Sequence, residues 1–535
     1  MISNPVLKGF NPDPSIVRVG EDYFIATSTF EWFPGIQIHH SRDLVNWRLL
    51  NRPLLRPSQL DLRGVPDGCG IWAPCLTYKD GLFHLVYSVV LRYGRTTVTG
   101  ANGLAFRDFH NFLITSESVT GDWSDPLLLN SSGFDPSLFH DDDGKTYLLN
   151  LLWDHRPDRP HFGGILLQEF CRAEQKLIGE RRMIYGGTEL GFTEGPHLLK
   201  RDGWYYLIVA EGGTGWDHAV TMARSRQIDG PYETCPTGPV LTSRGRPDNA
   251  LQRAGHGDLV QASDGSWFIA YLCGRPLPGL RNCVMGRETA IQPMRWRADG
   301  WLETFDGKST PEPLAPGLED TTSSGDPEPV RHDFDTPELP GEFQWLRSPC
   351  PDRLFSLKER PGFLRLHGRE SLGSYFEQAL VARRQQDFCF NATTMLDYTP
   401  RNFQQSAGLV VYYNAAKFHY CYVSYGETVG RHVTVMSCVP KADGARVKAQ
   451  IFPLADGPLE IRGGVENERL RFGFRQGADR EWTWFSQALD MSQLSDEAGP
   501  QDVPNFTGTF VGMACQDMSG DQLAADFDWF SYEDK

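Results

Sequence analysis

A repeat of about sixty residues fills the first three hundred residues and constrains the fold more than any other feature. Each copy opens with a short polar segment, continues into an apolar strand, turns tightly and returns in an aromatic-rich strand. The five copies begin at Asp13, Ala73, Asp135, Glu194 and His256. Four short strands per copy, without helical periodicity between them, are typical of a propeller blade. The repeat therefore predicts an all-β fold with a five-bladed β-propeller.

Four copies carry an Asp-Gly pair at nearly the same phase of the repeat. These pairs begin at Asp80, Asp143, Asp202 and Asp264. Asp-Gly between two alternating apolar runs is a strong hairpin signal, because both central residues of the turn must accept a positive φ. The alternative is a β-sandwich whose hairpins match by coincidence, and the shared phase favours blades.

The second half of the chain has a different pattern. Residues 308–332 are rich in Pro, Ser, Thr and acidic residues, which predicts an extended linker. Beyond them, alternating runs at 363–367, 408–413 and 470–474 predict antiparallel strands with one buried face. Two packed sheets would bury these faces. We therefore expect a propeller at 1–307, a linker at 308–332 and a β-sandwich at 333–535, which could also be a carbohydrate-binding module.

The composition excludes several classes of partner. The net charge is -16, with 52 Lys and Arg against 68 Asp and Glu, so neither nucleic acid nor an anionic membrane surface is expected as a partner. No apolar run approaches the roughly 20 residues of a membrane span. No signal peptide is visible, and the 11 Cys lack a Cys-x-x-Cys pair. These features predict reduced thiols, no zinc site and a cytoplasmic location.

Three carboxylic acids open copies of the repeat. Because the innermost strand of each blade lines the central channel, Asp13, Asp135 and Glu194 are expected to meet at its mouth. Like charges packed around one axis are typical of functional sites. Glycoside hydrolysis needs one protonated and one ionised carboxyl group, and one anion raises the pKa of its neighbour. The longer side chain of Glu194 makes it the candidate acid.

Two alternatives for the acidic cluster are open. A group of Asp residues can bind Ca²⁺, but the three acids lack the closely spaced ligand loop of a calcium site. A propeller can also bind sugar without cleaving it. Aromatic residues, which make up 12% of the chain, supply candidate sugar-stacking walls at residues 30–33 (Phe30, Trp32 and Phe33) and at Trp72.

Nine short motifs in order resemble the β-xylosidases of glycoside hydrolase family 43. In the first half they are NPDPS at 11–15, FEWFPG at 30–35, GIWAP at 70–74, SGFDPS at 132–137, TEGPH at 193–197 and GRETA at 286–290. In the second half they are GRES at 368–371, FQQSAGL at 403–409 and FTGTFVGM at 506–513. The resemblance runs nearly end to end and implies a second domain of the jelly-roll, concanavalin-like kind, packed on the propeller.

The resemblance implies an inverting mechanism and divides the labour among the three acids. Asp13 resembles the general base that activates water, and Glu194 the general acid. Asp135 resembles the third carboxylate, which orients the acid and tunes its pKa. Inversion requires the carboxyl groups of the base and the acid to lie about 6.5–9.5 Å apart.

The resemblance also assigns substrate-binding residues. Arg287 resembles an arginine that donates to sugar hydroxyls and steadies Asp135, while Phe30 and Trp72 resemble walls of the terminal-sugar pocket. Phe510 resembles a residue of the second domain that reaches over the pocket and closes it. His256 corresponds to a channel histidine that holds a hydrated cation in some relatives, so Ca²⁺ can bind there, although the chemistry requires no cofactor.

The implied activity is exo-acting release of terminal D-xylose from xylobiose and short β-1,4-xylo-oligosaccharides. The alternatives are an α-L-arabinofuranosidase or a dual enzyme and, in another class, a non-catalytic sugar-binding propeller. A homo-oligomer, dimer or tetramer, is the implied assembly. The chain departs from the family pattern at Ser88-Val89 and over 91–108, so a different leaving-group subsite is expected there.

Overall fold

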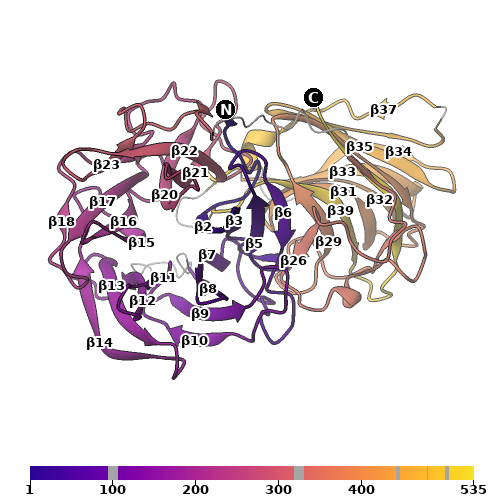
Figure 1. The fold of residues 1–535 in the computed structure, drawn as a ribbon. Helices are drawn as coiled ribbons and strands as arrows, with labels where there is room; N and C mark the ends of the chain where they lie inside the picture. Colours follow the sequence, from indigo (N-terminus) through magenta and orange to yellow (C-terminus); the bar gives the residue numbers. More distant parts are fainter. Residues whose placement is uncertain (94–105, 319–329, 441–445, 479, 500–504) are drawn as a thin grey trace.

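The computed structural model describes residues 1–93, 106–318, 330–440, 446–478, 480–499 and 505–535. Figure 1 shows two β-rich bodies side by side, with five small sheets arranged in a ring and two large sheets packed beside it. The described residues contain no α-helix, only the short 3-10 helices η1 (Pro351–Arg353) and η2 (Met491–Gln493). None of these helices is long and apolar enough to cross a membrane.

The ring is the predicted five-bladed propeller, and each blade is one antiparallel sheet. Blade 1 contains β2 (Ser15–Val19), β3 (Asp22–Thr27), β5 (Gln37–Ser41) and β6 (Arg48–Asn51). Blade 2 contains β7 (Gly70–Lys79), β8 (Leu82–Arg92), β9 (Asp108–Ser116) and β10 (Leu127–Asn130). Blade 3 contains β11 (Ser137–His140), β12 (Thr146–Trp153), β13 (Phe162–Cys171) and β14 (Lys176–Tyr185).

The last two blades complete the ring. Blade 4 contains β15 (Glu194–Arg201), β16 (Trp204–Glu211), β17 (Ala219–Ser225), β18 (Glu233–Thr234) and β19 (Leu241–Thr242). Blade 5 contains β20 (Gln252–Gln261), β21 (Trp267–Gly274), β22 (Glu288–Trp296) and β23 (Leu302–Thr304). The inner strands β2, β7, β11, β15 and β20 contact one another in this order, and β20 contacts β2. Equivalent residues of different blades therefore meet at the axis.

The Asp-Gly turns lie where the repeat predicts them, between the first two strands of blades 2 to 5. Asp80-Gly81 and Asp202-Gly203 have positive φ at both positions, with φ of 53° and 51° at the two Asp residues. At Asp143-Gly144 and Asp264-Gly265 only the Gly is left-handed. Two of the four turns thus have the expected backbone, and in the other two the Gly alone adopts the conformation that Cβ disfavours.

The second body is the predicted concanavalin-like sandwich. One sheet contains β27 (Phe355–Ser356), β28 (Leu364–Leu366), β40 (Ala525–Asp534), β30 (Cys389–Asp397), β35 (Leu459–Glu466), β36 (Arg469–Arg475) and β37 (Thr483–Trp484), with β25 (Val330–His332) and β38 (Leu489–Asp490) beside them. The other contains β34 (Arg446–Pro453), β33 (Gly430–Cys438), β32 (Lys417–Gly426), β31 (Gln405–Asn414), β39 (Phe510–Asp517), β29 (Ala379–Arg384), β26 (Gln344–Leu346) and β4 (Trp32–Phe33).

The segment predicted as a linker is structured at both ends. β24 (Leu314–Ala315) pairs with β1 (Ile2–Ser3), so the propeller extends past residue 307. At the other end β25 pairs with β40, so the sandwich begins before residue 333. Residues 319–329 lie outside the described residues. The Pro-rich composition correctly indicated a connection between the two domains. The short strands at its ends could not be predicted, because their partners lie far away in the sequence.

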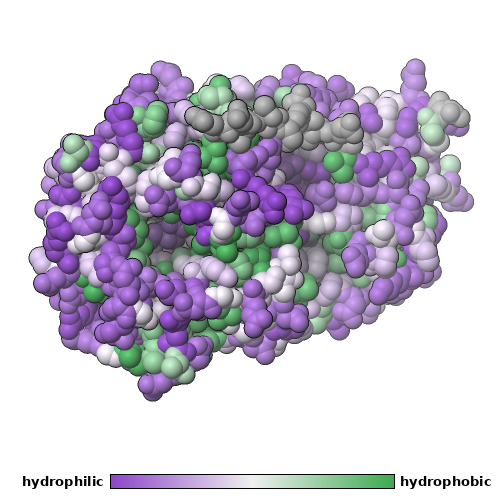
Figure 2. All heavy atoms as spheres, in the orientation of Figure 1, coloured by the Kyte–Doolittle hydropathy of each residue, from purple (hydrophilic) through white to green (hydrophobic). Residues whose placement is uncertain are grey.

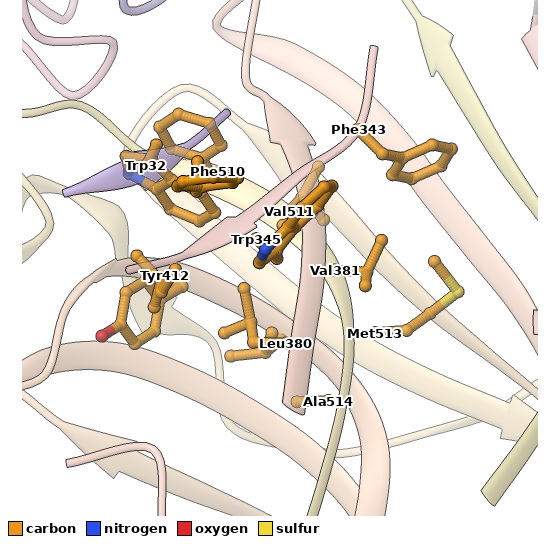
Figure 3. Packing of buried hydrophobic residues seen from close by; sticks show 14 of the residues in the cluster. Trp32, Phe343, Trp345, Leu380, Val381, Tyr412, Phe510, Val511, Met513 and Ala514 are labelled. Atoms are coloured by element: carbon orange, nitrogen blue, oxygen red, sulfur yellow. The ribbon is translucent and has the colours of Figure 1, made fainter. Parts of the chain in front are cut away.

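One apolar core runs through the contact between the two bodies. β4 lies within the first propeller repeat, yet it pairs with β26 of the sandwich. Trp32 of β4 stacks on Phe510 with ring centroids 3.6 Å apart and meets Tyr412 edge-on at 6.2 Å (Figure 3). The prediction that Trp32 and Phe33 line a sugar pocket is therefore wrong, because both are fully buried in this core. The propeller and sandwich instead share a strand and a core beside the channel.

Candidate active site

A cavity of about 230 Å³ lies at the mouth of the propeller channel. The space-filling view shows a hollow within the ring of blades (Figure 2). Its lining residues are Asp13, Phe30, Trp72, Tyr93, Phe134, Asp135, Phe162, Phe192, Glu194, Gly213, Thr214, His256, Arg287 and Phe506. Of the ten residues predicted from the sequence to form the site, seven are in this set, and the three that are missing are Trp32, Phe33 and Phe510.

In four of the five blades a residue at or near the inner strand has a left-handed φ, and two of these residues are the acids Asp13 and Asp135. Asp13 and Asp135 both precede a Pro and have a left-handed φ of 56° and 55°. This conformation is uncommon outside Gly and is found at functional sites. Gly195 and His256 have the same backbone in blades 4 and 5, with φ of 57° and 45°. These four residues are the equivalent positions of the repeat.

Glu194 is therefore one residue away from the position that the repeat alignment gave it. Gly195, which also precedes a Pro, takes the left-handed position in blade 4. The pairing of β15 with β16 shifts register between Glu194 and His197. Such a bulge changes the direction of a side chain at a strand end, and here Glu194 still lines the cavity beside Asp13 and Asp135.

Asp13 is held by two donors. The hydroxyl of Ser28 donates to Oδ2 at 2.6 Å, and Nη1 of Arg287 donates to Oδ1 at 3.0 Å. Nδ1 of His256 lies 3.6 Å from the same Oδ1. Arg287 was expected to steady Asp135, but its ion pair is with Asp13. The cation thus fixes the carboxylate of blade 1, and Asp135 has a different partner.

Asp135 and Glu194 are both buried next to like charges. The backbone N–H of Gly195 donates to Oδ2 of Asp135 at 3.0 Å. Burial and the charge of Asp13 raise the pKa of Asp135 well above its usual range. Burial first, and then Asp135 and Asp13, raise the pKa of Glu194 well above its usual range. No described residue donates a hydrogen bond to the Glu194 carboxyl, so the carboxyl is available to a ligand in the cavity, and its raised pKa favours the protonated form.

The sandwich contributes one wall, and it does so through Phe506. The Phe506 ring centroid lies 5.5 Å from that of Trp72, and its carbonyl accepts a hydrogen bond from Nη2 of Arg287 at 3.0 Å. Phe510 was expected to close the pocket, but it is fully buried against Trp32. Both belong to the motif FTGTF, and β39 begins only at Phe510, so the loop residue before the strand reaches the cavity.

Several aromatic residues of the wall were not predicted from the sequence. Tyr93, whose ring centroid is 4.9 Å from that of Trp72, lies in the segment 91–108 that departs from the family pattern. Residues 94–105 of that segment lie outside the described residues. Phe134 and Phe192 lie just before the candidate acids Asp135 and Glu194 in the sequence, and this proximity was the only sequence signal that they line the cavity. Ser88 is buried on β8 and donates to Asn111, and it does not line the cavity.

The channel donors do not by themselves fit Ca²⁺. Burial lowers the pKa of His256 to about 4, so its ring is neutral at neutral pH. Calcium prefers six to eight oxygen ligands, and the nearby Asp258 already accepts hydrogen bonds from Ser15 and Ile16. No group of three or more metal-ligating side chains is found among the described residues. A hydrated ion held through water by His256 stays a prediction, and no catalytic step is assigned to it.

The raised pKa of Glu194 has a consequence for stability. A carboxyl group whose pKa is higher in the folded than in the unfolded state stabilises the fold at low pH, and this contribution is lost as the pH rises above its ordinary value of 4.5. We expect Glu194→Gln, which stays neutral, to be more stable than the parent by about 1 kcal/mol at pH 8, with a smaller difference at pH 4. Melting temperatures across this range test it, and an equal difference at both pH values would contradict it.

Comparison with known proteins agrees with this geometry. The model for glycosyl hydrolases family 43 matches residues 2–302, and that for the beta xylosidase C-terminal concanavalin A-like domain matches residues 331–533. Xylosidase/arabinosidase 43B of Humicola insolens is 48% identical, covering 99% of this chain and 97% of its own. A beta-xylosidase of Bacillus subtilis is 47% identical over the whole of both chains.

A solved structure extends the likeness to three dimensions. The xylan beta-1,4-xylosidase of Bacillus halodurans superposes with a TM-score of 0.95 at 48% identity, and the match covers 100% of both chains. Both domains and their arrangement are therefore shared. The chain belongs to glycosyl hydrolase family 43.

Proposed function

We propose that this chain is an exo-acting β-xylosidase that releases D-xylose from the non-reducing end of xylobiose and short β-1,4-xylo-oligosaccharides with inversion. The observation that carries the proposal is the meeting of Asp13, Asp135 and Glu194 in one small aromatic-walled cavity. Phe506 and Arg287 wall one side of it, which favours a blind pocket for a terminal sugar over an open groove for a polymer. The names of the relatives support xylose as that sugar.

In the proposed mechanism Asp13 is the general base. Its two oxygens accept from Ser28 and Arg287, which fix its plane at the cavity wall. It takes a proton from a water molecule as that water attacks the anomeric carbon. Base and acid in such enzymes stand about 6.5–9.5 Å apart, which leaves room for the water between base and sugar.

Glu194 is the proposed general acid. Its raised pKa favours the protonated form, and its carboxyl is free to donate to the glycosidic oxygen as the bond breaks. Asp135 is bound to the N–H of the residue that follows Glu194, so it fixes the start of β15. The charge of Asp135 also contributes to the raised pKa of Glu194, which supports its assignment as the carboxylate that tunes the acid.

An α-L-arabinofuranosidase or dual activity is the second candidate. The relative from Humicola insolens is named for both sugars, which is the observation in its favour. Rates on 4-nitrophenyl β-D-xyloside and 4-nitrophenyl α-L-arabinofuranoside separate the two. A non-catalytic propeller is disfavoured because all three carboxyl groups are present and converge.

The product anomer tests the proposal. We expect proton NMR of early xylobiose hydrolysis to show α-xylose in excess of its equilibrium share, and xylan to yield xylose as its first product. Excess β-xylose would overturn the roles of Asp13 and Glu194, and internal cleavage of xylan would overturn exo action. Homo-oligomerisation and a cytoplasmic location stay predictions, and light scattering in solution measures the first.

A further inference from the structure

The carboxylate of Glu211 is buried among neutral donors, outside the cavity. Glu211 is the last residue of β16 and has no solvent-exposed surface. Its Oε1 accepts from the backbone N–H of Thr188 at 2.6 Å and from Oγ1 of Thr193 at 2.9 Å. Its Oε2 accepts from Oγ1 of Thr188 at 2.8 Å and from Oγ1 of Thr221 at 2.7 Å. No Lys, Arg or His of the described residues forms an ion pair with it.

These bonds close the loop that precedes β15. The loop has its own turn, with the N–H of Gly191 donating to the carbonyl of Thr188 at 3.2 Å, and the N–H of Gly212 donates to the carbonyl of Gly191 at 2.8 Å. A Cβ on Gly187 would lie 1.8 Å from Oγ1 of Thr193 and 2.7 Å from Oε1 of Glu211. The loop thus folds tightly over one carboxylate, and both of its ends are bound to it.

This loop carries two residues of the cavity, Phe192 and, directly after Thr193, Glu194. Phe192 has a left-handed φ of 52°, which the closed loop maintains. Because no described residue donates to the Glu194 carboxyl, the placement of that side chain depends on its backbone. Thr193, the residue before Glu194, is bound to Glu211 through its hydroxyl, and the N–H of Gly195, the residue after it, is bound to Asp135.

We propose that Glu211 is a positioning residue for the general acid: it anchors residues 188–193 and thereby sets where Glu194 meets the leaving oxygen. This inference rests on the proposed function, in which Glu194 protonates that oxygen. It assigns Glu211 a geometric role, through hydrogen bonds, and no contact with substrate. A misplacement of about 1 Å at a catalytic group can cost about 10²-fold in rate.

The donors around Glu211 allow a conservative variant to separate geometry from charge. In Glu211→Gln the amide oxygen can keep the bonds from the backbone N–H of Thr188 and from Thr193. The amide nitrogen then faces the hydroxyls of Thr188 and Thr221, which can turn and accept. Glu211→Gln therefore retains the anchor without the charge, whereas Glu211→Ala removes the anchor.

The experiment compares two substrates that differ in their need for an acid. Xylobiose needs a proton on its leaving oxygen, whereas 2,4-dinitrophenyl β-xyloside has a leaving group that departs without one. For Glu211→Ala we expect kcat to fall about 10²-fold on xylobiose and only a few-fold on the aryl xyloside, with KM little changed on both. Glu211→Gln is expected to match the parent on both, with the same pH profile. Glu233→Ala, on an exposed residue of the same sheet, is the matched control.

Each other outcome decides against the inference. Equal losses of Glu211→Ala on both substrates, or no loss on either, would overturn it, as would a Glu211→Gln variant as impaired as Glu211→Ala. If Glu211→Ala does not fold, Thr193→Val gives the same test, because it removes only the bond next to Glu194. It should show a smaller loss with the same bias towards xylobiose. Failure of the parent enzyme to release xylose from xylobiose would refute the proposed function instead.

Discussion

Replacing Asp13 by Asn is expected to lower kcat by about 10²–10⁴-fold on every xyloside, whatever its leaving group. An amide cannot take the proton of the attacking water, and that water is needed however good the leaving group is. The size and planarity of the side chain are kept: the amide oxygen can still accept from Arg287, and the amide nitrogen then faces the hydroxyl of Ser28, which can turn and accept. Initial rates on xylobiose and on 2,4-dinitrophenyl β-xyloside measure the loss, and circular dichroism confirms the fold.

Glu194→Gln is the matched control for the division of roles. It has the same burial and the same change from acid to amide, but the proposed acid matters only when the leaving oxygen needs a proton. Its loss should be large on xylobiose and small on the dinitrophenyl xyloside. If Asp13→Asn showed this leaving-group dependence and Glu194→Gln did not, the two assignments would have to be exchanged.

The site residues that the sequence predicts well are those that occupy the same position in different copies of the repeat. Asp13 and Asp135 precede a Pro at the same phase of two copies, and the structure gives them the same left-handed backbone. The repeat alignment places Glu194 one residue away from its structural position, because Gly195 is the residue with the left-handed backbone in blade 4. A repeat predicts which strand ends meet at the axis, but the register at a bulge depends on how each strand pairs.

The part that the sequence could not predict comes from contacts between the two domains. Phe506 and Phe510 stand four residues apart in one motif, and only the start of β39 decides which reaches the cavity. Trp32 looked like a sugar-stacking residue because nothing local shows that β4 joins a sandwich sheet more than three hundred residues away. Within the propeller, Arg287 likewise pairs with Asp13 across 274 positions of sequence. Such pairings depend on tertiary packing, which has no local pattern.

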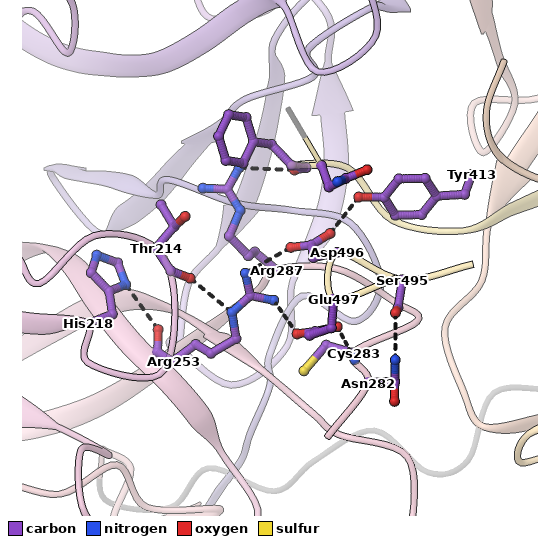
Figure 4. A network of polar contacts seen from close by, with 12 residues as sticks. Thr214, His218, Arg253, Asn282, Cys283, Arg287, Tyr413, Ser495, Asp496 and Glu497 are labelled. Carbon is purple, nitrogen blue, oxygen red and sulfur yellow. Dashed lines mark hydrogen bonds and ion pairs between the residues drawn. The ribbon is translucent and has the colours of Figure 1, made fainter. Parts of the chain in front are cut away.

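One of these interdomain contacts is a buried charged network beside the cavity (Figure 4). Arg253 of β20 lies 2.9 Å from Oδ2 of Asp496 and 3.0 Å from Oε1 of Glu497, both in the sandwich. Its Nε donates at 2.9 Å to the carbonyl of Thr214, which lines the cavity. The hydroxyl of Tyr413 donates to Asp496 at 2.7 Å. The network thus joins the rim of the propeller to the sandwich.

Replacing Arg253 by Met is expected to cost about 3–5 kcal/mol of unfolding free energy, because it leaves the buried Asp496 and the partly buried Glu497 without their cation. Arg244→Met is the control: Arg244 is exposed, pairs with Asp217 at 3.0 Å, and should contribute at most about 1 kcal/mol. Urea unfolding of both variants measures the difference. Adding Asp496→Asn and Glu497→Gln to Arg253→Met should recover part of the loss, since neutral amides need no cation. A loss no larger than that of Arg244→Met would show that the network does not hold the domains together.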